Sequence, residues 1–134
     1  MIVTSAYGQD AGRSEEMRMF GDCSGCSFDG ADFSERRLMG VNLAESRLNA
    51  VDFHGAQLNI AVFNGSVLRD VNFASANLRG ASFTGATLIN ASFEGADLRG
   101  AVFEGVTLDN TDLQQALLCN TQLPNDLMDN SDCN

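Results

Sequence analysis

The sequence predicts an all-β fold, a parallel β-helix with four flat sides and about five coils, preceded by a short helical cap. Three observations predict it. Every fifth residue from position 28 to position 123 is Phe or Leu, with no insertion or slip. A small or β-branched residue stands two positions before most of these centres, and Gly or Asn stands two positions after 13 of the 20. Such a repeat decides the architecture before any local propensity does.

A period of five suits neither the 3.6-residue helix nor the two-residue repeat of a flat strand. It fits a strand of about three residues followed by a tight turn, in which the centre and the small residue point inward. Gly or Asn two positions later supplies the positive φ that the turn needs. Four turns close a square, so 20 residues form one coil, and coils stack at about 4.8 Å through parallel ladders to give a rod of about 24 Å.

The same register predicts the core. Positions 20 apart stack on one another, and the strict Phe/Leu alternation from Phe53 to Leu108 places Phe on two opposite sides and Leu on the other two. We expect these side chains to interdigitate at the density of a protein interior. The predicted core includes Phe33, Phe53, Phe63, Phe73, Phe83, Phe93, Phe103, Leu58, Leu78 and Leu98.

The repeats are expected to cover residues 28–123, with a different segment at each end. Residues 1–12 show no period and are expected to be flexible, whereas residues 13–27 read as a cap with a short helix from Ser14, which can act as its N-cap, to Gly21. Residues 124–134 read as a C-terminal cap in which Leu127 and Met128 fold over the last coil. Arg36 stands in a slot that should be small and inward, so we expect a local distortion there or an Arg that reaches over the end of the rod.

The four cysteines form two pairs, Cys23 with Cys26 and Cys119 with Cys133. A single zinc site is unfavourable because Cys26 and Cys119 would lie about 22 Å apart along the stack, whereas zinc ligands lie about 2.3 Å from one metal. A thioredoxin-like redox site is also unfavourable, because it would need a βαβ setting and the repeat offers none. Two readings stay open: each pair is a disulfide that staples its end of the rod, or the thiols are reduced and partly buried.

The repeat resembles that of the pentapeptide-repeat family, whose unit is A(D/N)LXX. The stretches 31–33, 41–43, 76–78 and 96–98 carry it. The resemblance implies a right-handed quadrilateral β-helix. Residues 22–28 and 118–121 also resemble the Cys-bearing ends of extracytoplasmic members from bacteria and thylakoid lumens. We therefore expect an extracytoplasmic protein, with a cytoplasmic one as the alternative. Residues 1–6 lack the basic and long apolar regions of a signal peptide, so an extracytoplasmic location would require a leader that had already been removed.

Charge and motifs exclude several function classes. The 134 residues carry 18 acids and 8 basic residues, a formal charge of −10, which disfavours nucleic acid and anionic membranes as partners. No apolar run is long enough to span a bilayer.

Ser34, Asp52 and His54 share one predicted face, but a flat wall offers neither a pocket nor an oxyanion donor. A column of Asp, Asn and Ser there supplies too few oxygens for Ca²⁺. We expect no enzyme, no catalytic residue, no cofactor and no metal.

The sequence therefore favours a non-catalytic structural or protein-interaction module, a rigid rod whose flat faces bind an unknown protein, as a monomer or a weak dimer. Apolar residues at outward positions mark the candidate surface: Val62, Val102, Val67 and Ile89. The alternative comes from the family resemblance: some members imitate duplex DNA and inhibit or protect DNA gyrase. Against it, residues 28–123 hold 11 acids and 6 Arg, a net charge of only −5, with both signs intermixed.

Overall fold

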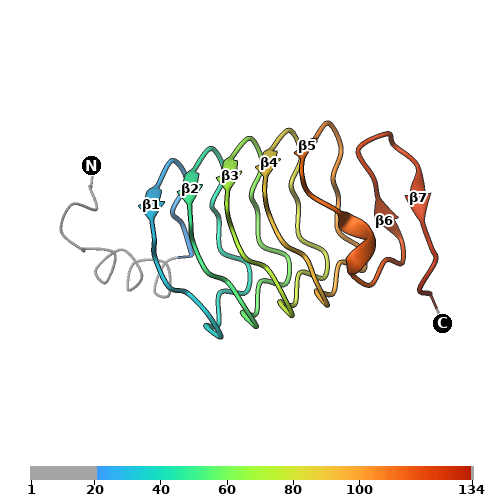
Figure 1. Ribbon diagram of the computed structural model, residues 1–134, viewed down its shortest axis with the longest axis horizontal. Helices are drawn as coiled ribbons and strands as arrows, with labels where there is room; N and C mark the ends of the chain where they lie inside the picture. Colours follow the sequence, from blue (N-terminus) through green and yellow to red (C-terminus); the bar gives the residue numbers. More distant parts are fainter. Residues whose placement is uncertain (1–20, 134) are drawn as a thin grey trace.

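The computed structural model describes residues 21–133, and they form a parallel β-solenoid (Figure 1). The predicted flexible segment 1–12 and most of the predicted helical cap lie outside the described residues. One side of the rod is a five-stranded parallel sheet in the order β1-β2-β3-β4-β5. Its strands are β1 (Ser27–Asp29), β2 (Arg47–Asn49), β3 (Val67–Arg69), β4 (Thr87–Ile89) and β5 (Thr107–Asp109).

The register of the stack is 20 residues on every side, as the repeat predicts. Phe28 pairs with Leu48, and the same offset continues through the strands to Leu108. On another side, single bridges run without a break from Asp22 through Asn42 and on to Gln122. This ladder spans five coils, which confirms the predicted architecture and begins the first coil earlier than the predicted start at Phe28.

The corners have the backbone that the turn residues predict. All of the described glycines have φ between 67° and 77°, and most of them stand two positions after a centre. Other residue types adopt the same left-handed conformation at this position, among them Glu45, Ile60 and Asn90. The corner is therefore imposed by the repeat itself, and glycine is the residue that accepts it with least strain.

The core is the predicted set of Phe and Leu columns. All ten predicted core residues are at most 3% exposed. Within a column the rings stack, as in Phe53 on Phe73, with centroids 5.3 Å apart and planes 4° apart. Between the two Phe columns the rings meet edge to face, as in Phe63 against Phe73 at 5.5 Å. Both geometries are favourable for aromatic pairs, so the two columns form one continuous aromatic core.

The first coil is closed partly by its own side chains. Cys23 occupies a centre and Cys26 the next small slot; both point inward, and a disulfide joins them with a Cα–Cα distance of 5.3 Å. Both are 3% exposed, so this disulfide belongs to the core. The Arg36 side chain reaches over the end of the rod, which is one of the two outcomes expected for it. Its guanidinium carbon lies 5.7 Å from the ring centre of Phe33, the first described Phe of its column.

The last coil departs from the repeat. A 3-10 helix, η2 (Leu113–Gln115), replaces one corner; Asp112 caps it by accepting a hydrogen bond from the Gln114 N–H. Beyond it, β6 (Thr121–Gln122) and β7 (Met128–Asp129) form an antiparallel pair. A disulfide between Cys119 and Cys133 ties this segment to the coil.

Leu127 and Met128 do not cover the last coil as expected, since they are 62% and 52% exposed. The physical reason is the backbone pairing of the C-terminal segment. The Leu123 N–H donates to the Leu127 carbonyl at 2.9 Å, and Met128 pairs with Gln122. The segment therefore turns back on β6, and these two side chains stay in solvent. Among residues 21–133 there is no helix long and apolar enough to cross a membrane.

Candidate interaction faces

The outward residues on either side of each centre form four faces of the rod. In chain order we call them the uncharged face (columns from Asn42 and Ala44), the sheet face (β1–β5), the acidic face (columns from Asp32 and Ser34) and the arginine face (columns from Arg37 and Met39). The uncharged face lies opposite the acidic face, because their centres are ten residues apart in a 20-residue coil. Each face has its own composition, so each is treated separately.

Ser34, Asp52 and His54 all lie on the acidic face, but their side chains are not hydrogen-bonded to one another. The Ser34 hydroxyl donates to Asp32 at 2.6 Å, and Asp52 accepts from the backbone N–H of His54. Hydrogen bonds from Ser34 hold the pKa of the Asp32 carboxyl below its usual range. These are turn hydrogen bonds of the kind that Asp makes two residues ahead. Among the described residues, no group of three or more His, Cys, Asp or Glu could hold a metal ion.

The arginine face carries a bidentate ion pair. Arg99 donates to both carboxylate oxygens of Asp97, at 2.8 and 2.7 Å. The hydrogen bond to Arg99 is the main cause that lowers the pKa of Asp97, and the same contact raises the pKa of Arg99. Arg79 lies in the same column one coil earlier. Because the pair is partly exposed, its contribution to stability is modest.

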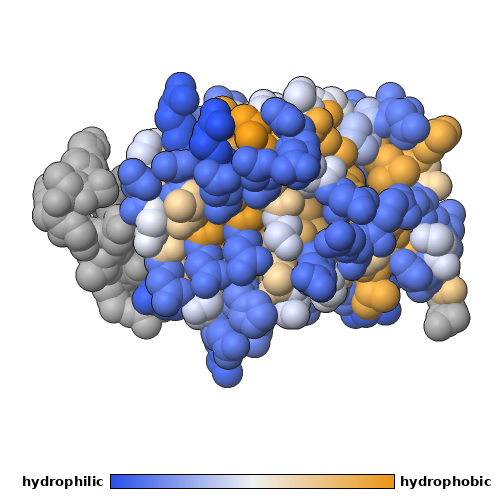
Figure 2. All heavy atoms as spheres, viewed as in Figure 1, coloured by the Kyte–Doolittle hydropathy of each residue, from blue (hydrophilic) through white to orange (hydrophobic). Residues whose placement is uncertain are grey.

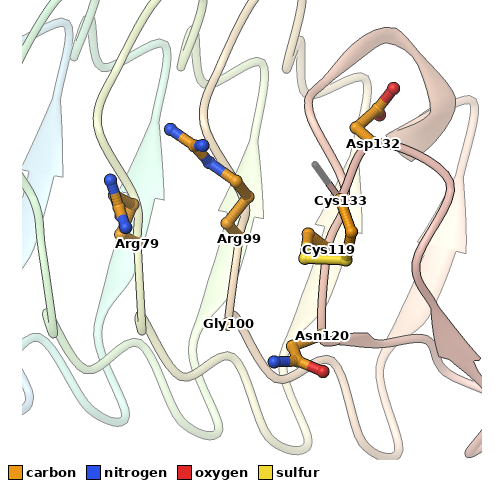
Figure 3. A pocket seen from close by; sticks show the side chains of 7 residues that line it. All are labelled: Arg79, Arg99, Gly100, Cys119, Asn120, Asp132 and Cys133. Atoms are coloured by element: carbon orange, nitrogen blue, oxygen red, sulfur yellow. A yellow bond between two sulfur atoms is a disulfide. The ribbon is translucent and has the colours of Figure 1, made fainter.

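A polar pocket of about 370 Å³ opens on this face at the C-terminal end of the rod (Figure 3). Arg79 and Arg99 extend from neighbouring coils on one side, and Asp132 with the Cys119–Cys133 disulfide lies on the other. Two of its charged groups already have structural partners: Arg99 binds Asp97, and the Asp132 carboxylate accepts from the Leu118 N–H at 2.9 Å. The disulfide and the hydrogen bond from Leu118 to Asp132 hold the C-terminal segment beside this pocket, and the residues that line it include no nucleophile poised next to a base.

The uncharged face is the one on which two of the predicted interaction residues meet. Val62 and Val102 flank Ser82 in one ladder. The neighbouring column holds Ala44, Asn64 and Thr84, whose polar groups bond within the face: Asn64 accepts from the Ser82 hydroxyl at 2.6 Å and from the Thr84 N–H at 3.0 Å. All of these side chains are half-buried. The result is a flat wall with no charge between Asp22 and Glu104 in either column, in a chain of formal charge −10.

Ile60 projects from the corner that leads into this face. It is 60% exposed, and its φ is 51°. A β-branched residue in the left-handed region is a genuine outlier, with a strain of about 1–2 kcal/mol. Its column holds Gly40, Gly80 and Gly100, and a Cβ placed on Gly80 would lie 3.3 Å from Ile60 Cγ2. The sequence shows Ile60 as an outward apolar residue two positions after a centre, where the repeat needs a positive φ, and the backbone confirms that conformation.

The other two predicted residues lie elsewhere. Val67 and Ile89 are half-buried on the sheet face, where they flank the central Leu residues of β3 and β4. Val67 pairs with Thr87, and Arg69 with Ile89. These two therefore stay a separate prediction from Val62 and Val102, and the four do not share one face.

Comparison with known proteins settles the family. The model of the pentapeptide repeats matches residues 26–65 and 66–105, with eight copies of the repeat. The chain belongs to the pentapeptide-repeat family. Its fold is accordingly the right-handed quadrilateral β-helix of that family. A search of curated proteins found no match.

Solved structures of other pentapeptide-repeat proteins are similar. One is a protein of the Arabidopsis thaliana thylakoid lumen, 28% identical, with a TM-score of 0.58 over 74% of this chain and 66% of that one. This chain thus spans just under two thirds of the Arabidopsis protein. A protein from the cyanobacterium Cyanothece 51142 is 21% identical over 80% of this chain and 93% of its own, with a TM-score of 0.46. The plasmid-mediated fluoroquinolone resistance protein QnrB1 is 14% identical over 71% and 73%, with a TM-score of 0.47.

Proposed function

We propose that this pentapeptide-repeat protein is a non-catalytic interaction module and that its uncharged face binds a protein partner. The observation that carries the proposal is Ile60. Strained backbone positions cluster at functional sites, and Asn, which accepts the left-handed region more easily, occupies the same column at Asn120. A strained, exposed Ile beside a flat wall supports a role for its side chain in contact with another molecule.

The surroundings of Ile60 support the same role. Interfaces are depleted of charge at their centre, and the wall of Val62, Ser82 and Val102 is uncharged while the opposite face carries Asp32, Asp52 and Asp112. The side chains of the wall are half-buried, and Ser82 is held by a hydrogen bond to Asn64, so little side-chain entropy is lost when a partner covers them. A rigid, flat and uncharged surface of this kind is suited to a protein partner.

Site-specific photocrosslinking in the native host tests the proposal. A photoreactive amino acid is placed at Ser82, on the uncharged face, or at Ser92, a half-buried outward Ser on the opposite face. We expect a discrete crosslinked species from position 82 that position 92 does not give, and that Ile60→Asn removes. Equal crosslinking from both positions, or none from position 82, would refute the proposal.

We further propose that the protein works in an oxidising compartment outside the cytoplasm. The two disulfides support this, because such bonds persist in oxidising compartments and are rare in the cytosol. The intact mass of protein from its native host, with and without alkylation under non-reducing conditions, is the test. Four free thiols would contradict the proposal.

Mimicry of duplex DNA stays the alternative prediction. The acids and Arg residues are unevenly distributed: the arginine face holds Arg37, Arg79 and Arg99, and the uncharged face has neither sign over most of its length. A DNA mimic needs a continuous negative potential along the rod. A supercoiling assay in which stoichiometric protein leaves gyrase unaffected would remove this alternative.

A further inference from the structure

β5 is the last strand of the parallel sheet and is paired on one side only, with β4. In the preceding coils each strand is covered by the next one, and the central residues Leu48, Leu68 and Leu88 are at most 1% exposed. Leu108, the central residue of β5, is only partly buried. An edge strand of this kind presents unpaired backbone groups that can bind another strand.

An apolar groove adjoins the same edge. It has a volume of about 340 Å³ and lies between β5, η2 and the turn at 123–125; Leu108, Leu113, Leu123 and Pro124 contribute its apolar lining. Hydrophobic atoms reach the surface toward the C-terminal end of the rod (Figure 2). The groove and the strand edge together offer both contacts that a bound strand uses, backbone hydrogen bonds and a recess for a side chain.

The chain has residues of its own in register for this place. Met128 is 20 residues after Leu108, and Asp129 is 20 after Asp109, yet both lie in β7 and pair with β6. A sixth coil built from them would stack Asp129 on Asp109, and like charges directly opposite one another are destabilising. Because β7 pairs with β6, the chain's own C-terminal segment leaves the edge of β5 open.

The charge around the groove specifies that strand. From residue 100 to the end, the chain has six acids and no Arg or Lys. Asp109 and Asp112 are exposed beside the groove, and Asp126 is exposed near its far wall. An apolar residue followed by Arg or Lys would place its apolar side chain over Leu108 and its cation beside Asp109. The chain's own β3, with the sequence Val-Leu-Arg, is a strand of this type that the ladder already accepts on both sides.

We propose that β5 and this groove bind an extended basic peptide segment of another protein, which adds to the sheet as a parallel sixth strand. The segment has an apolar residue at its centre and Arg or Lys directly after it. This is a second site at the end of the rod, independent of the uncharged face and its partner.

The probe is a synthetic, N-acetylated and C-amidated peptide, Ser-Val-Leu-Arg-Arg-Val, titrated into the oxidised full-length chain labelled with ¹⁵N. We expect amide shifts concentrated in β5 and η2, with a dissociation constant below about 1 mM that rises with salt concentration because screening weakens exposed charge pairs. The matched peptide Ser-Val-Leu-Asp-Asp-Val should bind at least about tenfold more weakly.

Two exposed Asp residues in the same column give a matched pair of variants. Asp109→Arg, on the free edge, should weaken binding by about tenfold or more, whereas Asp29→Arg, in β1 at the other end of the sheet, should change it less than about twofold. Neither side chain is buried, so both variants keep the core. No binding up to about 1 mM, shifts outside the β5 end, equal effects of the two variants, or a dimer whose interface is β5 would each overturn the proposal.

Discussion

Replacing Ile60 by Asn separates the stability of the rod from its proposed function. Asn tolerates the left-handed corner, so the change relieves about 1–2 kcal/mol of backbone strain. Against this, Ile60 is 60% exposed, so the loss of its buried part removes about two fifths of the roughly 1.5–3 kcal/mol that full burial of an Ile contributes. The two effects nearly offset, and the free energy of unfolding should stay the same or rise by about 1 kcal/mol.

Equilibrium urea unfolding followed by circular dichroism measures this change. Ile89→Asn is the control, because Ile89 is half-buried at an ordinary strand position in β4, where Asn has low strand propensity and relieves no strain. It should destabilise the protein by about 1 kcal/mol. If Ile60→Asn destabilises the protein as much as Ile89→Asn, the corner is not strained and the argument for Ile60 fails.

Three further predictions concern the core, the ion pair and the disulfides. Phe73→Ala should lower the free energy of unfolding by about 3–5 kcal/mol, because the ring is fully buried and packs against four others; a loss below about 1 kcal/mol in urea unfolding would contradict the stacked core. Because the pKa of Asp97 is lowered in the folded state, its contribution to stability is present above the unfolded pKa of about 3.9 and is lost as the pH falls below it. Asp97→Asn should therefore unfold with a weaker pH dependence between about pH 5 and pH 2, and an unchanged profile would argue against the ion pair. Under mild reduction, alkylation and mass spectrometry should detect Cys133, which is exposed, well before Cys23 or Cys26, which are 3% exposed; the reverse order would be inconsistent with a core disulfide.

Much of the fold follows from the repeat because the spacing of five leaves only one way to bury every centre. Phe53, Phe63 and Phe73 are buried where the register places them, and Cys23 with Cys26 falls on a centre and a small slot that the turn brings together. Arg36 breaks the repeat, and it lies over a ring at the first coil, one of the two expected outcomes. Each of these is decided by contacts within one coil or between adjacent coils.

The candidate sites follow less directly. The sequence marks Val62 and Val102 as outward and apolar, and the 20-residue register is enough to place them on one face. The same information places Val67 and Ile89 on a different face. It also places Ile60 two positions after a centre, where the repeat needs a positive φ, and the backbone confirms this with a φ of 51°. The extent to which the Ile60 side chain is exposed, 60%, is known only from the structure.

The sequence by itself therefore determined the coil, its register, its core and the residues on each face, since all of these repeat every 20 residues. Only the tertiary structure decided how the rod ends. Met128 is in register to stack on Leu108, yet it pairs with Gln122 in an antiparallel hairpin. The turn at 123–126 and the Cys119–Cys133 disulfide hold Met128 in that hairpin. Because Met128 cannot pair with β5 and with β6 at the same time, the outer edge of β5 stays open. The repeat specifies the contacts between one coil and the next, so it does not specify the outer edge of the last coil, which no further coil covers.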